Sequence, residues 1–150
     1  MIKYTDIYVS TLARGICNPG EQVVAAAAGT HQSFWTFRIP FFRHDYLLLA
    51  TSERLIVVDH RKGLLFDRMD AVESFRWVDI GSLSLGGFFG AHLVVKDSAN
   101  RTVLRMRTPR IEPIAKNGAA LKKVVHAWEQ RRALGSGMQA YGALPSSLVA

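Results

Sequence analysis

Residues 46–59, YLLLATSERLIVVD, decide the fold that this sequence predicts. Two apolar runs flank Ser52 and Glu53, and a two-residue loop of this kind predicts an antiparallel hairpin in which Leu47 faces Val58. Successive side chains point to opposite faces of the hairpin, and both faces are apolar. A hairpin with one face in water would alternate apolar and polar residues. We therefore expect other elements to cover both faces.

One of these faces is a candidate apolar interface. It carries Leu48, Leu55 and Val57. A second copy of the chain or a protein partner would bury this face in one interpretation. In the other, a helix near the N-terminus covers it.

The composition is that of a single globular domain. The chain has 150 residues, of which 49% are hydrophobic and 21% are charged, as in ordinary soluble proteins. No apolar run reaches the ~18–20 residues that cross a bilayer, and residues 1–15 lack the pattern of a signal peptide. Cys17 is the only cysteine, which excludes a disulfide framework. We expect a cytoplasmic protein, with peripheral attachment to a membrane left open.

Hydrophobic periodicity and turn residues predict short strands between two helices. The last helix starts at Pro113, with its firm part nearer Asn117, and ends at Gly135. The residues on one of its faces are Ile114, Leu121, Val124, Val125 and Trp128. The other elements expected are a helix at 2–16, strands at 22–30, 64–69, 72–79, 91–96 and 101–108, a polar turn at 60–63 and a Gly/Ser loop at 81–90.

About seven short strands before one amphipathic helix predict an α+β fold. We expect a small β-barrel or sandwich of antiparallel strands, with the C-terminal helix packed on one end and a short N-terminal helix. The domain should span residues 21–134, after a helical segment at 1–20 and before a tail at 135–150.

Short patterns in the chain resemble a known family. Thr51, Arg54 and Leu55 have the form T-x-x-R-L before an Ile-Val-Val strand, and residues 69–75 read MDAVESF. With the closing helix, these features resemble the bacterial pleckstrin-homology-like (PH-like) domains of the YokE type. The resemblance covers about residues 21–134. It implies a PH-like barrel and no established activity.

The sequence has no pattern that predicts catalysis, a metal site or a cofactor. The five histidines, at positions 31, 44, 60, 92 and 126, lack the spacing of a metal motif. No G-x-S-x-G sequence is present. Residues 86–90, GGFFG, lack the Lys-Ser/Thr of a phosphate-binding loop and precede a strand. We expect a protein that is not an enzyme.

Positive charge is concentrated in one segment. Ten basic and three acidic residues lie between Lys96 and Arg132, which accounts for the whole formal charge of +7. A hairpin with its turn at 97–100 would pair Lys96 with Arg101 and His92 with Arg105. The candidate basic surface on its outer face is His92, Lys96, Arg101, Arg105 and Arg107. It is either solvated charge or a site for an anionic partner.

Two segments are rich in aromatic residues. The first, residues 35–43, combines them with arginines, and the second carries the adjacent Phe88 and Phe89. Core packing is one interpretation of these rings. The others are nucleic-acid stacking or an interfacial membrane site for the first segment, and insertion into a partner or a bilayer surface for the second. The candidate aromatic loops contain Trp35, Phe37, Arg38, Phe41, Phe42, Arg43, Phe88 and Phe89.

These observations leave two classes of function open. The first is a non-catalytic PH-like interaction module that self-associates or binds a protein partner. The alternative is a peripheral binder of anionic membrane lipids, through the basic surface and an aromatic loop. Nucleic-acid binding has only the positive charge in its favour and no recognised motif.

Overall fold

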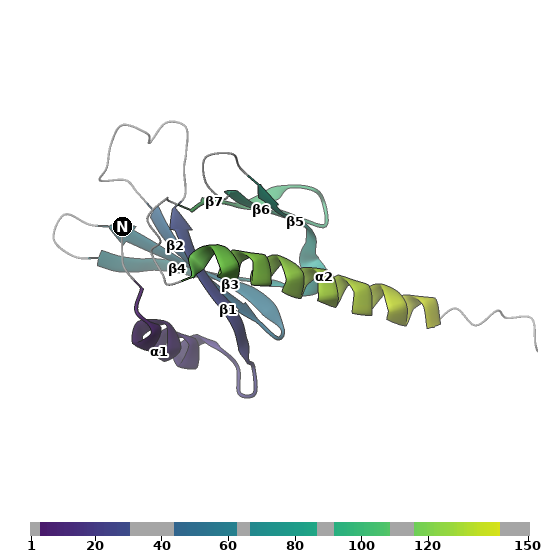
Figure 1. Ribbon diagram of the computed structural model, residues 1–150, viewed down its shortest axis with the longest axis horizontal. Helices are drawn as coiled ribbons and strands as arrows, with labels where there is room; N and C mark the ends of the chain where they lie inside the picture. Colours follow the sequence, from purple (N-terminus) through teal and green to yellow (C-terminus); the bar gives the residue numbers. More distant parts are fainter. Residues whose placement is uncertain (1–3, 31–43, 63–66, 87–91, 109–115, 142–150) are drawn as a thin grey trace, which may run out of the picture.

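The computed structural model describes residues 4–30, 44–62, 67–86, 92–108 and 116–141. These residues form one antiparallel sheet of seven strands with a short helix near the N-terminus and a long helix near the C-terminus (Figure 1). The α+β prediction is confirmed. The elements are α1 (Asp6–Ile16), β1 (Val23–Thr30), β2 (His44–Thr51), β3 (Arg54–Lys62), β4 (Asp67–Arg76), the 3-10 helix η3 (Trp77–Asp79), β5 (Ile80–Gly86), β6 (His92–Asp97), β7 (Thr102–Arg107) and α2 (Asn117–Tyr141).

Over the described residues, the sheet does not close into the barrel that was one of the two expected forms. Its strand order is β4-β3-β2-β1-β7-β6-β5, with β4 and β5 at its edges. Its two halves meet where Thr30 of β1 pairs with Arg107 of β7. Gly29 makes this junction possible. A Cβ atom at residue 29 would lie 2.5 Å from Cγ of Met106 and 2.9 Å from the carbonyl oxygen of Arg107. The two strands therefore approach closely because residue 29 has no side chain.

The β2–β3 hairpin has the predicted register, with Leu47 opposite Val58 and Leu48 opposite Val57. Both of its faces are buried, as expected. Val9 of α1 belongs to the apolar cluster on one face, which we call the outer face of the sheet. Residues of α2 and of β5–β7 belong to the cluster on the opposite, inner face.

Helix α1 is attached to the sheet near both of its ends. At its start, His60 of β3 is buried, and its two ring nitrogens lie 3.2 Å and 2.7 Å from the hydroxyl oxygens of Tyr4 and Tyr8. The Thr5 hydroxyl caps the helix by accepting a hydrogen bond from the backbone N–H of Tyr8. At its end, Arg54 donates to the backbone carbonyl of Ile16.

Helix α2 covers the inner face with the side chains predicted for it. Leu121, Val124 and Trp128 are buried, and the Trp128 indole N–H donates to the carbonyl of Ile80 at 3.1 Å. Residues 129–134 are exposed, and the C-terminal part of the helix extends beyond the sheet (Figure 1). Among the described residues, no helix is both long and apolar enough to cross a membrane.

Several element boundaries differ from the prediction. The loop expected at 81–90 is strand β5 over its described part. The two strands expected at 64–69 and 72–79 are replaced by the single strand β4 and the helix η3. Strand β3 runs through the turn expected at 60–63 as far as Lys62, and α2 continues past Gly135.

Candidate interaction surface

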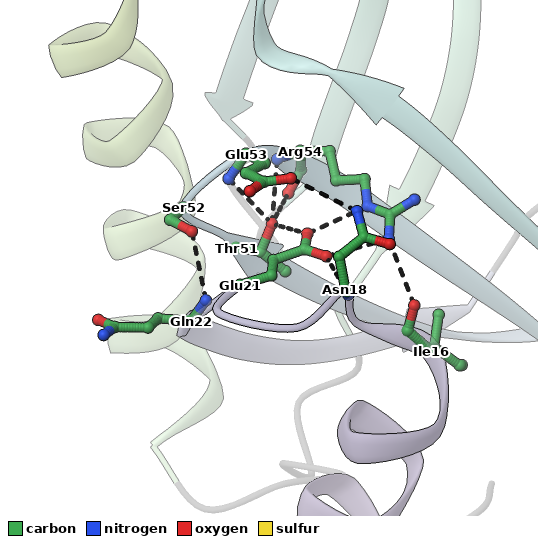
Figure 2. Close-up of polar contacts among 8 residues, drawn as sticks. All are labelled: Ile16, Asn18, Glu21, Gln22, Thr51, Ser52, Glu53 and Arg54. Carbon is green, nitrogen blue, oxygen red and sulfur yellow. Dashed lines mark hydrogen bonds and ion pairs between the residues drawn. The ribbon is translucent and has the colours of Figure 1, made fainter.

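The residues that carry the family resemblance have a structural role. Glu21, in the connection between α1 and β1, forms an ion pair with Arg54 in which both carboxylate oxygens accept hydrogen bonds at 3.0 Å (Figure 2). The Thr51 hydroxyl lies against the same carboxylate and accepts from the backbone N–H groups of Glu53 and Arg54. The T-x-x-R-L pattern thus closes the hairpin turn and holds the end of α1.

The Glu21 side chain has no exposed surface. Burying its carboxylate is unfavourable unless the charge is paired and hydrogen-bonded. Hydrogen bonds from Arg54 lower the pKa of the Glu21 carboxyl to about 2, against the opposing effect of burial. Thr51 and the backbone N–H of Asn18 act in the same direction. The carboxylate is therefore already satisfied by the protein, which makes it a poor candidate for binding a ligand.

A pocket of about 380 Å³ lies beside this network, between α1 and the start of β1. Its lining includes Arg14, Cys17 and Val23. Burial raises the pKa of the Cys17 thiol, and the nearby Glu21 carboxylate adds to this effect. The thiolate is disfavoured here, as in a structural cysteine. Within the described ranges, no group of three or more His, Cys, Asp and Glu residues could hold a metal ion.

The prediction of an apolar interface is wrong, because its residues lie in the core. Leu48, Leu55 and Val57 are 0–3% exposed and belong to the inner core with Leu121 of α2. The face is apolar because the C-terminal helix and the second half of the sheet cover it. The alternative cover, the N-terminal helix, lies on the opposite face of the same hairpin.

The β6–β7 hairpin has the predicted faces but not the predicted register. Val94 pairs with Arg105, and His92 pairs with Arg107, two residues away from the expected partners. One residue of the shift arises at the turn, where Asn100 has a φ of 62°, and the other at an irregularity beside Lys96. A shift of two residues leaves every side chain on the same face. The alternate residues Leu93, Val95, Leu104 and Met106 are buried as predicted.

The outer face of β5–β7 therefore carries a cluster of basic side chains, which we call the basic face. Arg101 and Arg105 are exposed, and His92, Lys96 and Arg107 are partly exposed. Arg101 differs from the rest because its guanidinium forms an ion pair with Asp97 at 2.8 Å. In β5, Ser82 and Ser84 pair with residues of β6 and add hydroxyl groups to the same face. The basic face consists of Ser82, Ser84, His92, Lys96, Arg105 and Arg107.

The candidate aromatic loops lie outside the described residues, in the segments 31–43 and 87–91. The strand ends that bracket them are described and lie at one end of the sheet. Thr30 pairs with Arg107, Arg107 pairs with His92, and His92 pairs with Gly86. Both segments therefore leave the sheet beside the His92–Arg107 pair of the basic face.

Sequence reasoning missed a second exposed feature, at the β4 edge. Met69 and Val72 are 48% and 43% exposed, and Val72 lies on the outer face opposite Val58. Tyr8 of α1 is also exposed on this side, where it contacts His60. Met69 and Val72 belong to the MDAVESF stretch, whose pattern does not indicate that the strand lies at an edge.

Comparison with known proteins adds one structural likeness. No protein-family model matches the chain. No curated protein matches it. A crystal structure of the C-terminal domain of an unknown protein from Leishmania infantum is similar, with a TM-score of 0.53 and 14% identity over 81% of this chain and 97% of that one. At this identity the likeness concerns the fold alone.

Proposed function

We propose that this chain is a non-catalytic interaction module with a PH-like fold, and that its basic face binds an anionic membrane surface. The observation that supports the proposal is the gathering of His92, Lys96, Arg105 and Arg107 on one face of β6–β7. On the described part of β5–β7, the single acidic residue, Asp97, is paired with Arg101.

The physical argument is electrostatic. Anionic lipids attract each Lys or Arg near the membrane surface by about 1 kcal/mol. The attraction is screened over about 8–10 Å at physiological ionic strength. Aromatic residues of the segments that leave the sheet beside His92 and Arg107 would add apolar contact at the interface.

Co-sedimentation with phospholipid vesicles tests the proposal. We expect binding to vesicles that contain phosphatidylserine, little binding to neutral vesicles, and a steep loss of binding as salt increases. Replacing Arg105 and Arg107 by Ser should weaken binding about 30-fold, since two cations contribute about 2 kcal/mol. At Arg105, which is exposed, the single change to Ser should alter the melting temperature little, because substitutions of exposed charges usually lie within about ±0.5 kcal/mol.

The matched control is the double variant R68S/R76S, which removes the same charge from β4. Its arginines form ion pairs with Asp70 and Asp79 on the other half of the sheet. We expect it to bind vesicles almost as the wild type does. Equal weakening by both double variants would mean that net charge alone acts, and an absence of binding at low salt would refute the proposal.

A second candidate function is binding of a protein partner or of a second copy. The sequence-based argument for it no longer holds, because Leu48, Leu55 and Val57 are core residues. A different observation favours it, namely the exposed apolar side chains at the β4 edge. Sedimentation of the purified protein at increasing concentration tests this candidate separately from the vesicle assay.

A further inference from the structure

Strand β4 is a long strand at one edge of the sheet. It spans ten residues and pairs with β3 along one side. On its other side, no strand of the described sheet lies beside it. An edge of this kind presents a row of backbone N–H and C=O groups to which another strand can add.

The first part of β4 is protected against such addition. There the pairing is irregular, because Ala71 faces Asp59 while Met69 faces His60, which leaves Asp70 without a facing residue. Asp70 is also paired with Arg68 at 2.8 Å. Bulges and charges are common devices against edge-to-edge pairing.

The second part of β4 lacks the bulge, and its charged residues are Glu73 and Arg76. From Ala71 to Arg76 the pairing with β3 is regular, and this stretch contains neither lysine nor proline. Val72 is 43% exposed on the outer face, and Phe75 packs only partly against the inner core. Residues 71–76 therefore form a regular, partly apolar edge that is open to another strand.

We propose that residues 72–76 of β4 pair with the same residues of a second copy of this chain, in antiparallel orientation and with the two-fold axis at Ser74. The proposal does not depend on the membrane proposal, since β4 and the basic face lie in opposite halves of the strand order.

Charge disfavours two other symmetric registers. An axis at Glu73 would place two carboxylates directly opposite each other, and like charges in that position are destabilising. An axis at Val72 would bring Arg76 opposite Arg68 of the second copy, across the irregular part of the strand. With the axis at Ser74, Val72 faces the aliphatic stem of Arg76 from the second copy, and no like charges are directly opposite.

The pairing should produce a weak dimer. A contact of about five residues on each strand is small beside the interfaces of obligate dimers. We therefore expect a monomer–dimer equilibrium that depends on protein concentration, with a continuous sheet across the two copies. Both α1 helices would lie on the same side of that sheet, because a two-fold axis perpendicular to the sheet preserves its faces.

Analytical ultracentrifugation over a wide range of concentration gives the first test. The wild type should dimerise, and Val72→Lys should raise the dissociation constant at least about tenfold, since an edge lysine opposes strand pairing. The matched control is Val78→Lys, in η3, where the side chain is 80% exposed and outside the strand. A wild type that stays monomeric, or a dimer that V72K leaves intact, overturns the proposal.

Disulfide trapping gives the second test and does not depend on the stability of V72K. In a background with Cys17→Ser, Ser74→Cys should form an intermolecular disulfide under mild oxidation, because the two residues at a two-fold axis face each other. Ser84→Cys, exposed on the other edge strand, should not. A dimer that S74C does not cross-link, or cross-linking of S84C to the same extent, refutes the assigned register.

Discussion

The side-chain amide of Asn117 forms two hydrogen bonds with the backbone of Ala28. The Ala28 N–H donates to Oδ1 of Asn117 at 2.7 Å, and Nδ2 of Asn117 donates to the Ala28 carbonyl at 2.8 Å. Asn117 is fully buried at the start of α2. Strand β1 pairs with β7 only at Thr30, so this amide satisfies backbone groups that the sheet does not. One side chain thus joins the C-terminal helix to the middle of β1.

Replacing Asn117 by Ala should lower the free energy of unfolding by about 2–4 kcal/mol, because two buried backbone groups of Ala28 lose their partners. Asn117→Asp should be similarly destabilised at neutral pH and partly recover in acid, where a protonated carboxyl can donate. Urea denaturation at two pH values measures both effects. The control Asn18→Ala, at an exposed position, should stay within about 0.5 kcal/mol.

The Glu21–Arg54 ion pair predicts a specific dependence of stability on pH. The pKa of Glu21 falls from 4.5 to about 2 on folding. A carboxyl with a lowered pKa contributes stability that is fully present above pH 4.5 and is lost as the pH falls toward 2. The contribution at neutral pH should be about 1–3 kcal/mol.

Glu21→Gln should therefore be less stable than the wild type at pH 7, and the difference should shrink as the pH falls through this window. Thermal denaturation at a series of pH values measures the difference. Glu53→Gln, at an exposed position in the same turn, provides the matched control and should show a smaller difference at every pH. A difference between wild type and E21Q that is independent of pH would contradict the assigned ion pair.

Two glycine-to-alanine substitutions should have opposite effects. Gly29→Ala should destabilise the protein by about 1–3 kcal/mol, because its Cβ would meet the Arg107 carbonyl as well as the Met106 side chain. Gly15→Ala, in α1 with no atom within 4 Å of the new Cβ, should stabilise it by about 0.5–1 kcal/mol. Melting temperatures of the two variants check the signs. A stable G29A would mean that β1 and β7 can separate without cost.

The features that the sequence predicts correctly are those set by local rules. The β2–β3 register follows from a two-residue turn and from strict alternation, as at Leu47 and Val58. The inward faces of β6 and β7 follow from alternation alone. Their register does not, because the left-handed conformation of Asn100 and the irregularity beside Lys96 each add one residue.

Other features depend on contacts between distant parts of the chain. The glycines and serines of β5 predict a loop, yet Gly81 is needed for packing, since a Cβ there would lie 2.4 Å from the Asp97 carbonyl oxygen. The buried contacts of His60 with Tyr4 and Tyr8 join residues more than fifty positions apart. Nothing in the spacing of these residues could have indicated such contacts. The position of the sheet edge at β4 likewise depends on the complete strand order.

The β2–β3 hairpin is buried on one face in a cluster with α1 and on the other in a cluster with α2 and β5–β7. This arrangement determines how slowly its backbone exchanges hydrogen for deuterium. Leu48 and Val57 are 0% and 3% exposed, and their strands are paired on both sides within the sheet. Lifting either helix leaves these amides hydrogen-bonded, so their exchange requires the whole domain to unfold. Amides of β4 that point away from β3, at the free edge of the described sheet, should exchange much faster by local opening. The slowest amides of the hairpin would thus report the global stability in water, without any denaturant.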